Sequence, residues 1–146
     1  MKKKLLTSDY LFEKYPSLFR GKDLSMRETA MCWGIECGSG WYGIIDELCE
    51  RIQTHCDNNG YDEVRFSQIK EKYATLRVYV NFGSEEIYAY IDEAEEQSSH
   101  VCELCGSKRG KLYNENGWLS VRCKKCKTKE DAYTAEGEKI IKKSLA

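Results

Sequence analysis

Four of the eight cysteines in this 146-residue chain are arranged as two Cys-x-x-Cys pairs. Cys102 and Cys105 form the first pair, Cys123 and Cys126 form the second, and seventeen residues separate the pairs. Four thiolates with this spacing converge on one tetrahedral zinc ion, and such a shell leaves no open position for water or substrate. The pattern therefore predicts one structural zinc ion per chain. Gly106, directly after the first pair, suits the tight backbone reversal that the pair requires.

Other interpretations of these four cysteines are less favoured. Two disulfides need an oxidising compartment, but Thr7-Ser8-Asp9 ends the short apolar run that follows the basic start, so we expect no secretory signal and no membrane span. A redox Cys-x-x-Cys would lie near a βαβ pattern, which we do not find in the sequence. His100 is an alternative ligand, although four well-spaced cysteines already complete the site. A reducing cytoplasm is the expected location.

The remaining cysteines are Cys32, Cys37, Cys49 and Cys56. Cys49 and Cys56 fall on the apolar face of an expected helix, where a free thiol behaves as a small hydrophobic side chain. A second metal site that combines these cysteines with His55 stays an open alternative. Their spacings match no common zinc pattern.

A segment rich in glycine and tryptophan, from Met31 to Gly43, is the second candidate site. Its candidate binding residues are Trp33, Gly38, Gly40, Trp41 and Tyr42. Glycines permit tight turns or the close approach of a ligand, and exposed aromatic side chains are typical binding anchors. The glycines at 38, 40 and 43 also match a phosphate-binding pattern, but that pattern needs a parallel βαβ unit, which we do not expect here.

Charge is unevenly distributed along the chain, although the net charge is only −1. Residues 101–129 contain eight lysines and arginines against two glutamates, whereas residues 1–100 contain twelve against eighteen acidic residues. Basic side chains contact phosphates and an aromatic side chain stacks on a base. The candidates for such contacts are Lys108, Arg109, Lys111, Trp118, Lys124 and Lys125. The alternative is that these lysines and arginine only balance the charge of the zinc-bound thiolates.

Hydrophobic periodicity predicts the elements that position these residues. A helix is expected over 41–56, two strands over 64–82 in one antiparallel hairpin, and a second helix over 84–97. A shorter hairpin is expected between the cysteine pairs, across the Asn-Gly at 116–117. This order predicts an α+β fold with both helices on one face of the first hairpin. The expected parts are a core domain (1–100), a zinc ribbon (101–129) and a C-terminal tail or short helix (130–146).

Two local breaks in the regular elements are also expected. Pro16 should split the apolar segment 11–19, because its ring clashes with the preceding helical turn. The alternation of apolar and polar residues fails between Phe66 and Ile69, which predicts a β-bulge or an early strand end.

Four stretches of the chain form a recognisable set: residues 10–16, 33–41 with 44–49, 69–77, and 102–106 with 117–119. As a set they resemble a family of small, uncharacterised proteins encoded by tailed bacteriophages and prophages. The resemblance implies an accessory protein that works in the cytoplasm of a bacterial host. This chain differs at Ala74, where relatives often carry glycine, and at Gly43, where they often carry another residue. The second difference argues further against a phosphate-binding loop.

The candidate functions belong to different classes. An enzyme is not expected, because neither His55 nor His100 lies beside a convincing nucleophile or acid partner. The main prediction is a phage accessory protein that inhibits or sequesters a host defence protein or a small signalling ligand. The segment Trp33–Tyr42 would be its binding surface. The alternative is a protein whose zinc ribbon binds nucleic acid.

Overall fold

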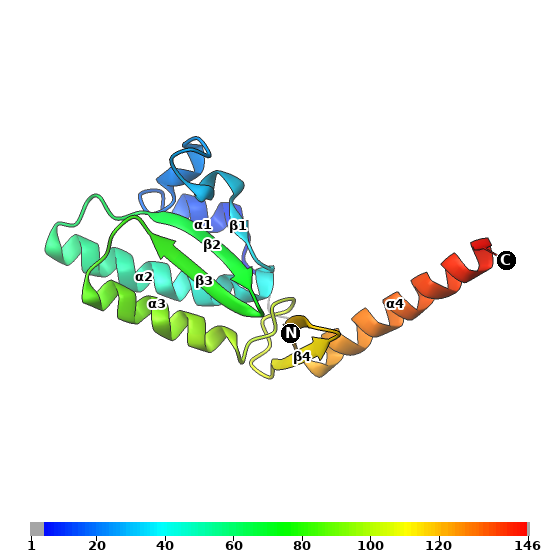
Figure 1. Cartoon of the computed structure of the whole chain (residues 1–146). Coiled ribbons are helices and arrows are strands. Elements are labelled where there is room, and N and C mark those ends of the chain that lie inside the picture. The colour runs from blue at the N-terminus through cyan, green and yellow to red at the C-terminus, as the bar shows by residue number, and fades with distance from the viewer. Residues whose placement is uncertain (1–4, 146) are drawn as a thin grey trace.

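Four α-helices and two sheets make up the described part of the chain (Figure 1). The computed structural model describes the backbone of residues 5–145 and the side chains of residues 5–136; residues 1–4 and 146, at the ends of the predicted core domain and tail, lie outside it. The α-helices are α1 (Ser8–Lys14), α2 (Tyr42–Asn59), α3 (Glu85–Ser98) and α4 (Lys124–Leu145). The strands are β1 (Ile35–Glu36), β2 (Phe66–Lys72), β3 (Thr75–Val80), β4 (Lys111–Glu115) and β5 (Trp118–Arg122). Short 3-10 helices cover Arg20–Asp23, Ala30–Trp33 and Ser39–Trp41.

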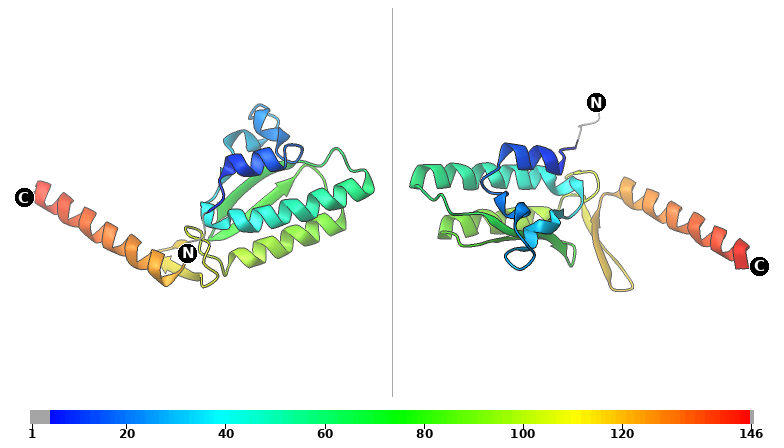
Figure 2. Two further views of the ribbon diagram at one scale, coloured as in Figure 1. Left: turned by 180° about the vertical axis from the view of Figure 1, so that it is seen from behind. Right: turned by 90° about the horizontal axis from the view of Figure 1, so that it is seen from above.

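The central unit is a three-stranded sheet that α2 and α3 cover on one face (Figures 1 and 2). β2 and β3 form the predicted antiparallel hairpin. Ile52 of α2, Ile87 of α3 and Leu76 of β3 are fully buried in one hydrophobic cluster. Each such side chain stabilises the fold by roughly 1.5–3 kcal/mol relative to full exposure. The fold is α+β, with both helices on one face of the hairpin as predicted.

The third strand of this sheet was not predicted. β1 pairs in parallel with β2, so that Ile35 lies opposite Ile69 and Glu36 lies opposite Lys70. The chain from β1 through α2 to β2 is therefore a βαβ unit, and our expectation that none is present was wrong. A strand of two residues has no alternation to detect, and its pairing partner lies more than thirty residues away in the sequence.

Both edges of the β2–β3 hairpin are covered by other parts of the chain. On the β3 edge, the Leu76 N–H donates to Ser98 Oγ at 3.0 Å and the Val78 N–H donates to Glu95 Oε2 at 3.1 Å. On the β2 edge, Thr29 Oγ1 donates to the carbonyl of Ser67 at 2.9 Å. Ser67 lies at a register shift between Phe66 and Gln68, which confirms the predicted bulge.

The segment before β1 forms a small lobe against the start of β2. α1 ends at Lys14, before Pro16, as predicted. Phe19 packs between two other rings, with its centroid 5.0 Å from that of Phe12 and 5.0 Å from that of Phe66. The Phe66 N–H donates to the carbonyl of Leu18 at 2.9 Å, so the lobe and the sheet share both apolar and backbone contacts.

The turn between β2 and β3 holds two residues in the left-handed region. Tyr73 has a φ of 53° and Ala74 a φ of 64°, while Lys72 pairs with Thr75 across the turn. A two-residue hairpin with positive φ at both positions favours asparagine and glycine there. Ala74 therefore lies at a backbone position that glycine would occupy without strain.

We expect Tyr73→Asn to raise the free energy of unfolding by about 1 kcal/mol, because asparagine adopts the left-handed conformation at lower cost than tyrosine. The Tyr73 side chain is 70% exposed, so little packing is lost. Urea unfolding followed by circular dichroism measures the change. Tyr73→Phe keeps the strained backbone and is expected to leave stability unchanged. A Tyr73→Asn protein no more stable than the parent would contradict the expectation.

A second unit follows α3. β4 and β5 form the predicted hairpin, with positive φ at Asn116 (55°) and Gly117 (86°) in its turn. The C-terminal helix differs from the prediction, because α4 begins at Lys124, inside the second cysteine pair, and runs for 22 residues away from the rest of the molecule (Figure 1). Among the described residues, no helix is both long enough and apolar enough to cross a membrane.

Candidate metal centre

The four paired cysteines come together in space, one pair from before the β4–β5 hairpin and the other from after it. Their sulfur atoms all lie within 4.8 Å of one another, and the sulfurs of Cys105 and Cys123 are 3.6 Å apart. A tetrahedral ion with metal–sulfur bonds of about 2.3 Å would hold its ligand sulfurs about 3.8 Å apart. The geometry therefore fits one metal ion with four thiolate ligands. Among the described residues, this is the one group of histidine, cysteine and acidic side chains close enough to hold a metal.

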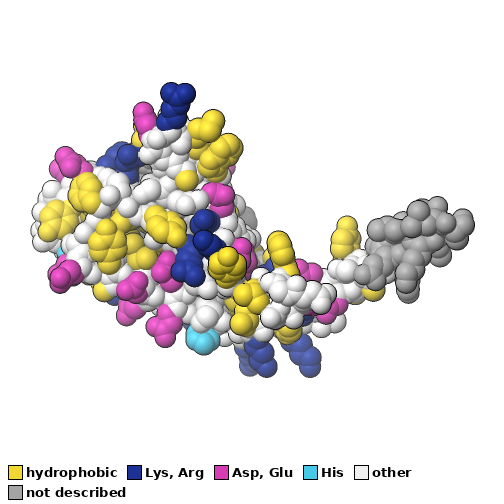
Figure 3. Space-filling view, in the orientation of Figure 1, with side chains coloured by type: hydrophobic (Ala, Val, Ile, Leu, Met, Phe, Trp, Pro, Cys, Tyr) yellow, Lys and Arg dark blue, Asp and Glu magenta, His cyan; other side chains and the backbone are white. Residues whose placement is uncertain are grey.

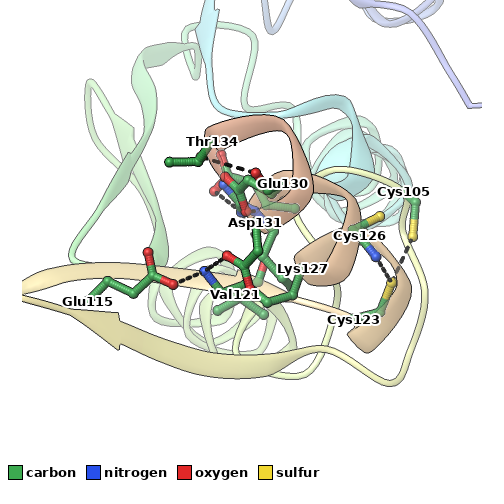
Figure 4. Close-up of polar contacts among 11 residues, drawn as sticks. Cys105, Glu115, Val121, Cys123, Cys126, Lys127, Glu130, Asp131 and Thr134 are labelled. Atoms are coloured by element: carbon green, nitrogen blue, oxygen red, sulfur yellow. Dashed lines mark hydrogen bonds and ion pairs between the residues drawn. The ribbon is translucent and has the colours of Figure 1, made fainter. Parts of the chain in front are cut away.

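Local backbone structure brings each pair of cysteines together. In the first pair, the Gly106 N–H donates to the carbonyl of Cys102 at 2.9 Å, and Gly106 has a φ of +81°. This conformation confirms the predicted reversal and favours glycine. In the second pair, the start of α4 places Cys126 one helical turn after Cys123 (Figure 4).

The thiols of the cluster differ in acidity. The Cys126 N–H donates to the Cys123 sulfur at 3.4 Å and holds the pKa of Cys123 down at about 7. Burial, followed by hydrogen bonds that the Cys126 thiol donates to neighbouring sulfurs, raises the pKa of Cys126, and burial also raises that of Cys105. Four thiolates this close repel one another, and a bound cation would offset the repulsion.

The first cysteine pair is also where the ribbon joins the core. Gly38 donates its N–H to Glu103 Oε2 at 2.8 Å, and Gly40 donates its N–H to the carbonyl of Glu103, also at 2.8 Å. A Cβ atom on Gly40 would lie 2.2 Å from the carbonyl oxygen of Cys102, and one on Gly38 would lie 2.4 Å from that of Glu103. These two glycines permit close contact between backbones.

This joint also explains the match to a phosphate-binding pattern. The glycines do follow a parallel strand and precede a helix, as such a loop requires. Here, however, the carboxylate of Glu103 accepts the Gly38 N–H that an anionic ligand would otherwise accept. The loop binds an anion from its own chain, so it is not free for a phosphate group.

Comparison with known proteins gives no identification. No family model matches this chain, and neither does any curated protein or solved structure.

A network of charged side chains fixes α4 to the ribbon (Figure 4). Arg122 lies 3.6 Å from the Glu103 carboxylate and donates from Nε to Glu130 at 3.2 Å. Lys127 is only 8% exposed; it pairs with Glu115 of β4 and, at 2.9 Å, with Asp131. The first turns of α4 are therefore held against β4 and β5. We did not predict these roles, because Glu115 lies on a different element from Lys127 and Glu130 on a different element from Arg122.

The structure separates the five candidates of the glycine–tryptophan segment. Trp41 is fully buried, and its Nε1 donates to the carbonyl of Val101 at 2.8 Å. Gly38 and Gly40 pack against the first cysteine pair, and Tyr42 is half-buried beside the core. Trp33 alone among the five has a largely exposed side chain, at 64%. Most of this segment joins the core to the ribbon, so it offers little surface to a partner.

The basic candidates of the ribbon are all on the surface. None of Lys108, Arg109, Lys111, Lys124 and Lys125 forms an ion pair with another described side chain. Trp118, at the turn of the β4–β5 hairpin, is 78% exposed. These residues are available for contact with a partner, in contrast to Arg122 and Lys127.

The remaining cysteines and histidines lie apart from the cluster. Cys49 and Cys56 are buried in the hydrophobic core, and burial raises the pKa of both thiols. Cys37 is half-buried with its pKa raised to about 12, mainly by burial. His55 Nε2 lies 3.0 Å from Ser84 Oγ, at the start of α3. The buried thiols of Cys49 and Cys56 therefore contribute to packing as small apolar side chains.

Proposed function

We propose that this chain is a non-enzymatic nucleic-acid-binding protein whose ribbon is folded by one zinc ion. Zinc is the metal that best suits four cysteines in two Cys-x-x-Cys pairs, and a closed thiolate shell stabilises structure without supplying catalysis. That the chain belongs to a phage family, and that it works in a bacterial cytoplasm, are predictions from the sequence.

The observation that carries this proposal is the separation of charge between the layers of the molecule. α2 and α3, on one face of the sheet, contain ten carboxylates and one arginine. The ribbon carries the exposed cations named above, which form no ion pair with another described side chain. Acidic side chains spread over the whole surface would repel a polyanion. Because they are concentrated on α2 and α3, on one side of the molecule, the ribbon is free to attract one.

A protein partner is the second candidate, and the exposure of Trp33 favours it. Met26, in the same lobe, is also exposed, and two such side chains are suitable anchors for a protein surface. The burial of Trp41 and the packing of Gly38 and Gly40 remove most of the segment that we first considered for this role. We therefore favour the nucleic-acid function.

The test is fluorescence anisotropy with labelled 20-nucleotide strands at increasing salt. If the protein neutralises four phosphates, affinity should fall roughly fiftyfold between about 50 and 200 mM salt. Reversing the charges of Lys108, Arg109, Lys124 and Lys125 together should abolish binding and leave the zinc content unchanged. Arg27 is an exposed residue of the lobe that forms no ion pair with another described side chain, so Arg27→Glu is the control for a charge reversal outside the ribbon and should have little effect. Absence of binding by the parent protein, or binding insensitive to salt, would refute the proposal.

A further inference from the structure

One face of the β1–β2–β3 sheet has no helix over it in the described part of the chain (Figures 1 and 2). Cross-strand pairing sets Gln68 opposite Tyr79, Lys70 opposite Arg77, and Lys72 opposite Thr75. Side chains alternate between the faces of a sheet, and Ile69, Leu76 and Val78 are buried on the other face. The uncovered face, which we name the open sheet face, therefore consists of Gln68, Lys70, Lys72, Thr75, Arg77 and Tyr79 of β2 and β3, with the exposed Glu36 of β1 beside Lys70.

The cations of the open sheet face form no ion pair with another described side chain. Among the described residues, none of Lys70, Lys72 and Arg77 forms an ion pair, although Glu36 lies next to Lys70 in register. The Nε atom of Arg77 is buried and has no hydrogen-bond partner among those residues. The other N–H groups of this guanidinium can donate to an acceptor from outside the chain.

Aromatic side chains accompany these cations. Tyr79 is 47% exposed on the open sheet face, and Tyr73 is exposed in the turn at its end. Alternate residues along a strand are about 7 Å apart, so Thr75, Arg77 and Tyr79 form an evenly spaced row. In Figure 3, Lys and Arg side chains lie near the centre of this face, close to hydrophobic ones.

We propose that the open sheet face binds single-stranded nucleic acid, with Tyr79 stacked on a base and Lys70, Lys72 and Arg77 in contact with phosphates. The inference rests on the proposed function and adds the surface and the form of the ligand. A tyrosine on a flat sheet can stack only on a base that is unpaired. The β4–β5 hairpin, which carries Lys111 and Trp118, extends toward this same side of the sheet (Figure 2, right), so the hairpin and the open sheet face can contact one nucleic-acid strand. The acidic helices lie on the opposite side.

The experiment compares matched variants of the zinc-loaded full chain. Labelled thymidine and uridine 20-mers and a 20-base-pair duplex are the ligands, and anisotropy gives the dissociation constants. Tyr79→Ala should weaken single-strand binding about tenfold, whereas Tyr88→Ala, at an equally exposed tyrosine of α3 (48%), should leave it unchanged. Lys72→Glu should weaken binding more than Arg27→Glu, which alters the net charge equally. Circular dichroism and zinc content confirm that each variant is folded.

The outcomes separate this inference from the proposed function. If Tyr79→Ala and Lys72→Glu bind single-stranded nucleic acid as tightly as the parent protein, the ribbon alone makes the contacts. That result overturns the inference and leaves the proposed function standing. Binding of the duplex as tightly as the single strand also overturns it. If no ligand binds, both fail. If the parent protein is dimeric and the Tyr79→Ala variant is monomeric, the open sheet face binds a second copy of the chain. That result also overturns the inference.

Discussion

Cys123→Ser is expected to lose the metal and unfold the ribbon. Serine is a poor ligand for zinc, and a structural site that loses one of four thiolates loses much of the binding energy that folds it. We expect the free energy of unfolding to fall by about 3 kcal/mol or more. Elemental analysis measures the metal, and urea unfolding measures the stability. Chelation of the parent protein should have the same effect.

The matched control for this variant is Cys32→Ser. The Cys32 sulfur lies outside the cluster, 3.5 Å from the carbonyl oxygen of Thr29, to which a serine hydroxyl can also donate. This variant is expected to keep one zinc ion per chain and to lose little stability. A Cys123→Ser protein with full metal content, or with the stability of the parent, would show that the cluster does not hold the ribbon together.

Gly40→Ala is expected to destabilise the protein by about 3 kcal/mol, because overpacking against backbone atoms cannot be relieved by a change of rotamer. The new Cβ would lie 2.2 Å from the carbonyl oxygen of Cys102 and 2.5 Å from the carbonyl carbon of Glu103. To relieve this clash, the first cysteine pair must move away from the start of α2. Urea unfolding measures the loss, and weaker zinc retention under chelator competition should accompany it.

Gly43→Ala is the control, three residues further along. A Cβ at Gly43 meets nothing within 4 Å, and the residue lies in the first turn of α2. Alanine there should stabilise the protein by about 0.5–1 kcal/mol through its lower conformational entropy when unfolded. If Gly40→Ala were as stable as Gly43→Ala, the joint between core and ribbon would not be as close as the structure indicates.

The parts of the fold that could be predicted are those encoded by local patterns. The apolar stripe of α2, the alternation in β3 and the two cysteine pairs each lie within a short stretch of sequence, and each forms as expected. The Asn-Gly turn between β4 and β5 and the break at Pro16 are equally local. In all these cases the residues that decide the structure are near neighbours along the chain.

The parts that could not be predicted depend on distant partners. Exposed tryptophans are typical of binding surfaces, but Trp41 is buried because its ring packs at the joint and its Nε1 reaches Val101, sixty residues away. Gly38 and Gly40 met the local requirement for a ligand loop, yet their neighbour in space is Glu103. The length of α4 was missed because its lysine-rich start was interpreted as ribbon, whereas Lys127 holds that turn against β4.

The hydrogen bonds that Ser98 and Glu95 make to β3 limit how the molecule can assemble. A bare edge strand offers its N–H groups to the strand of another molecule, which is a common route to aggregation. In this chain the amides of Leu76 and Val78 are already engaged by α3. Copies of the protein therefore cannot extend the sheet from this edge without displacing α3.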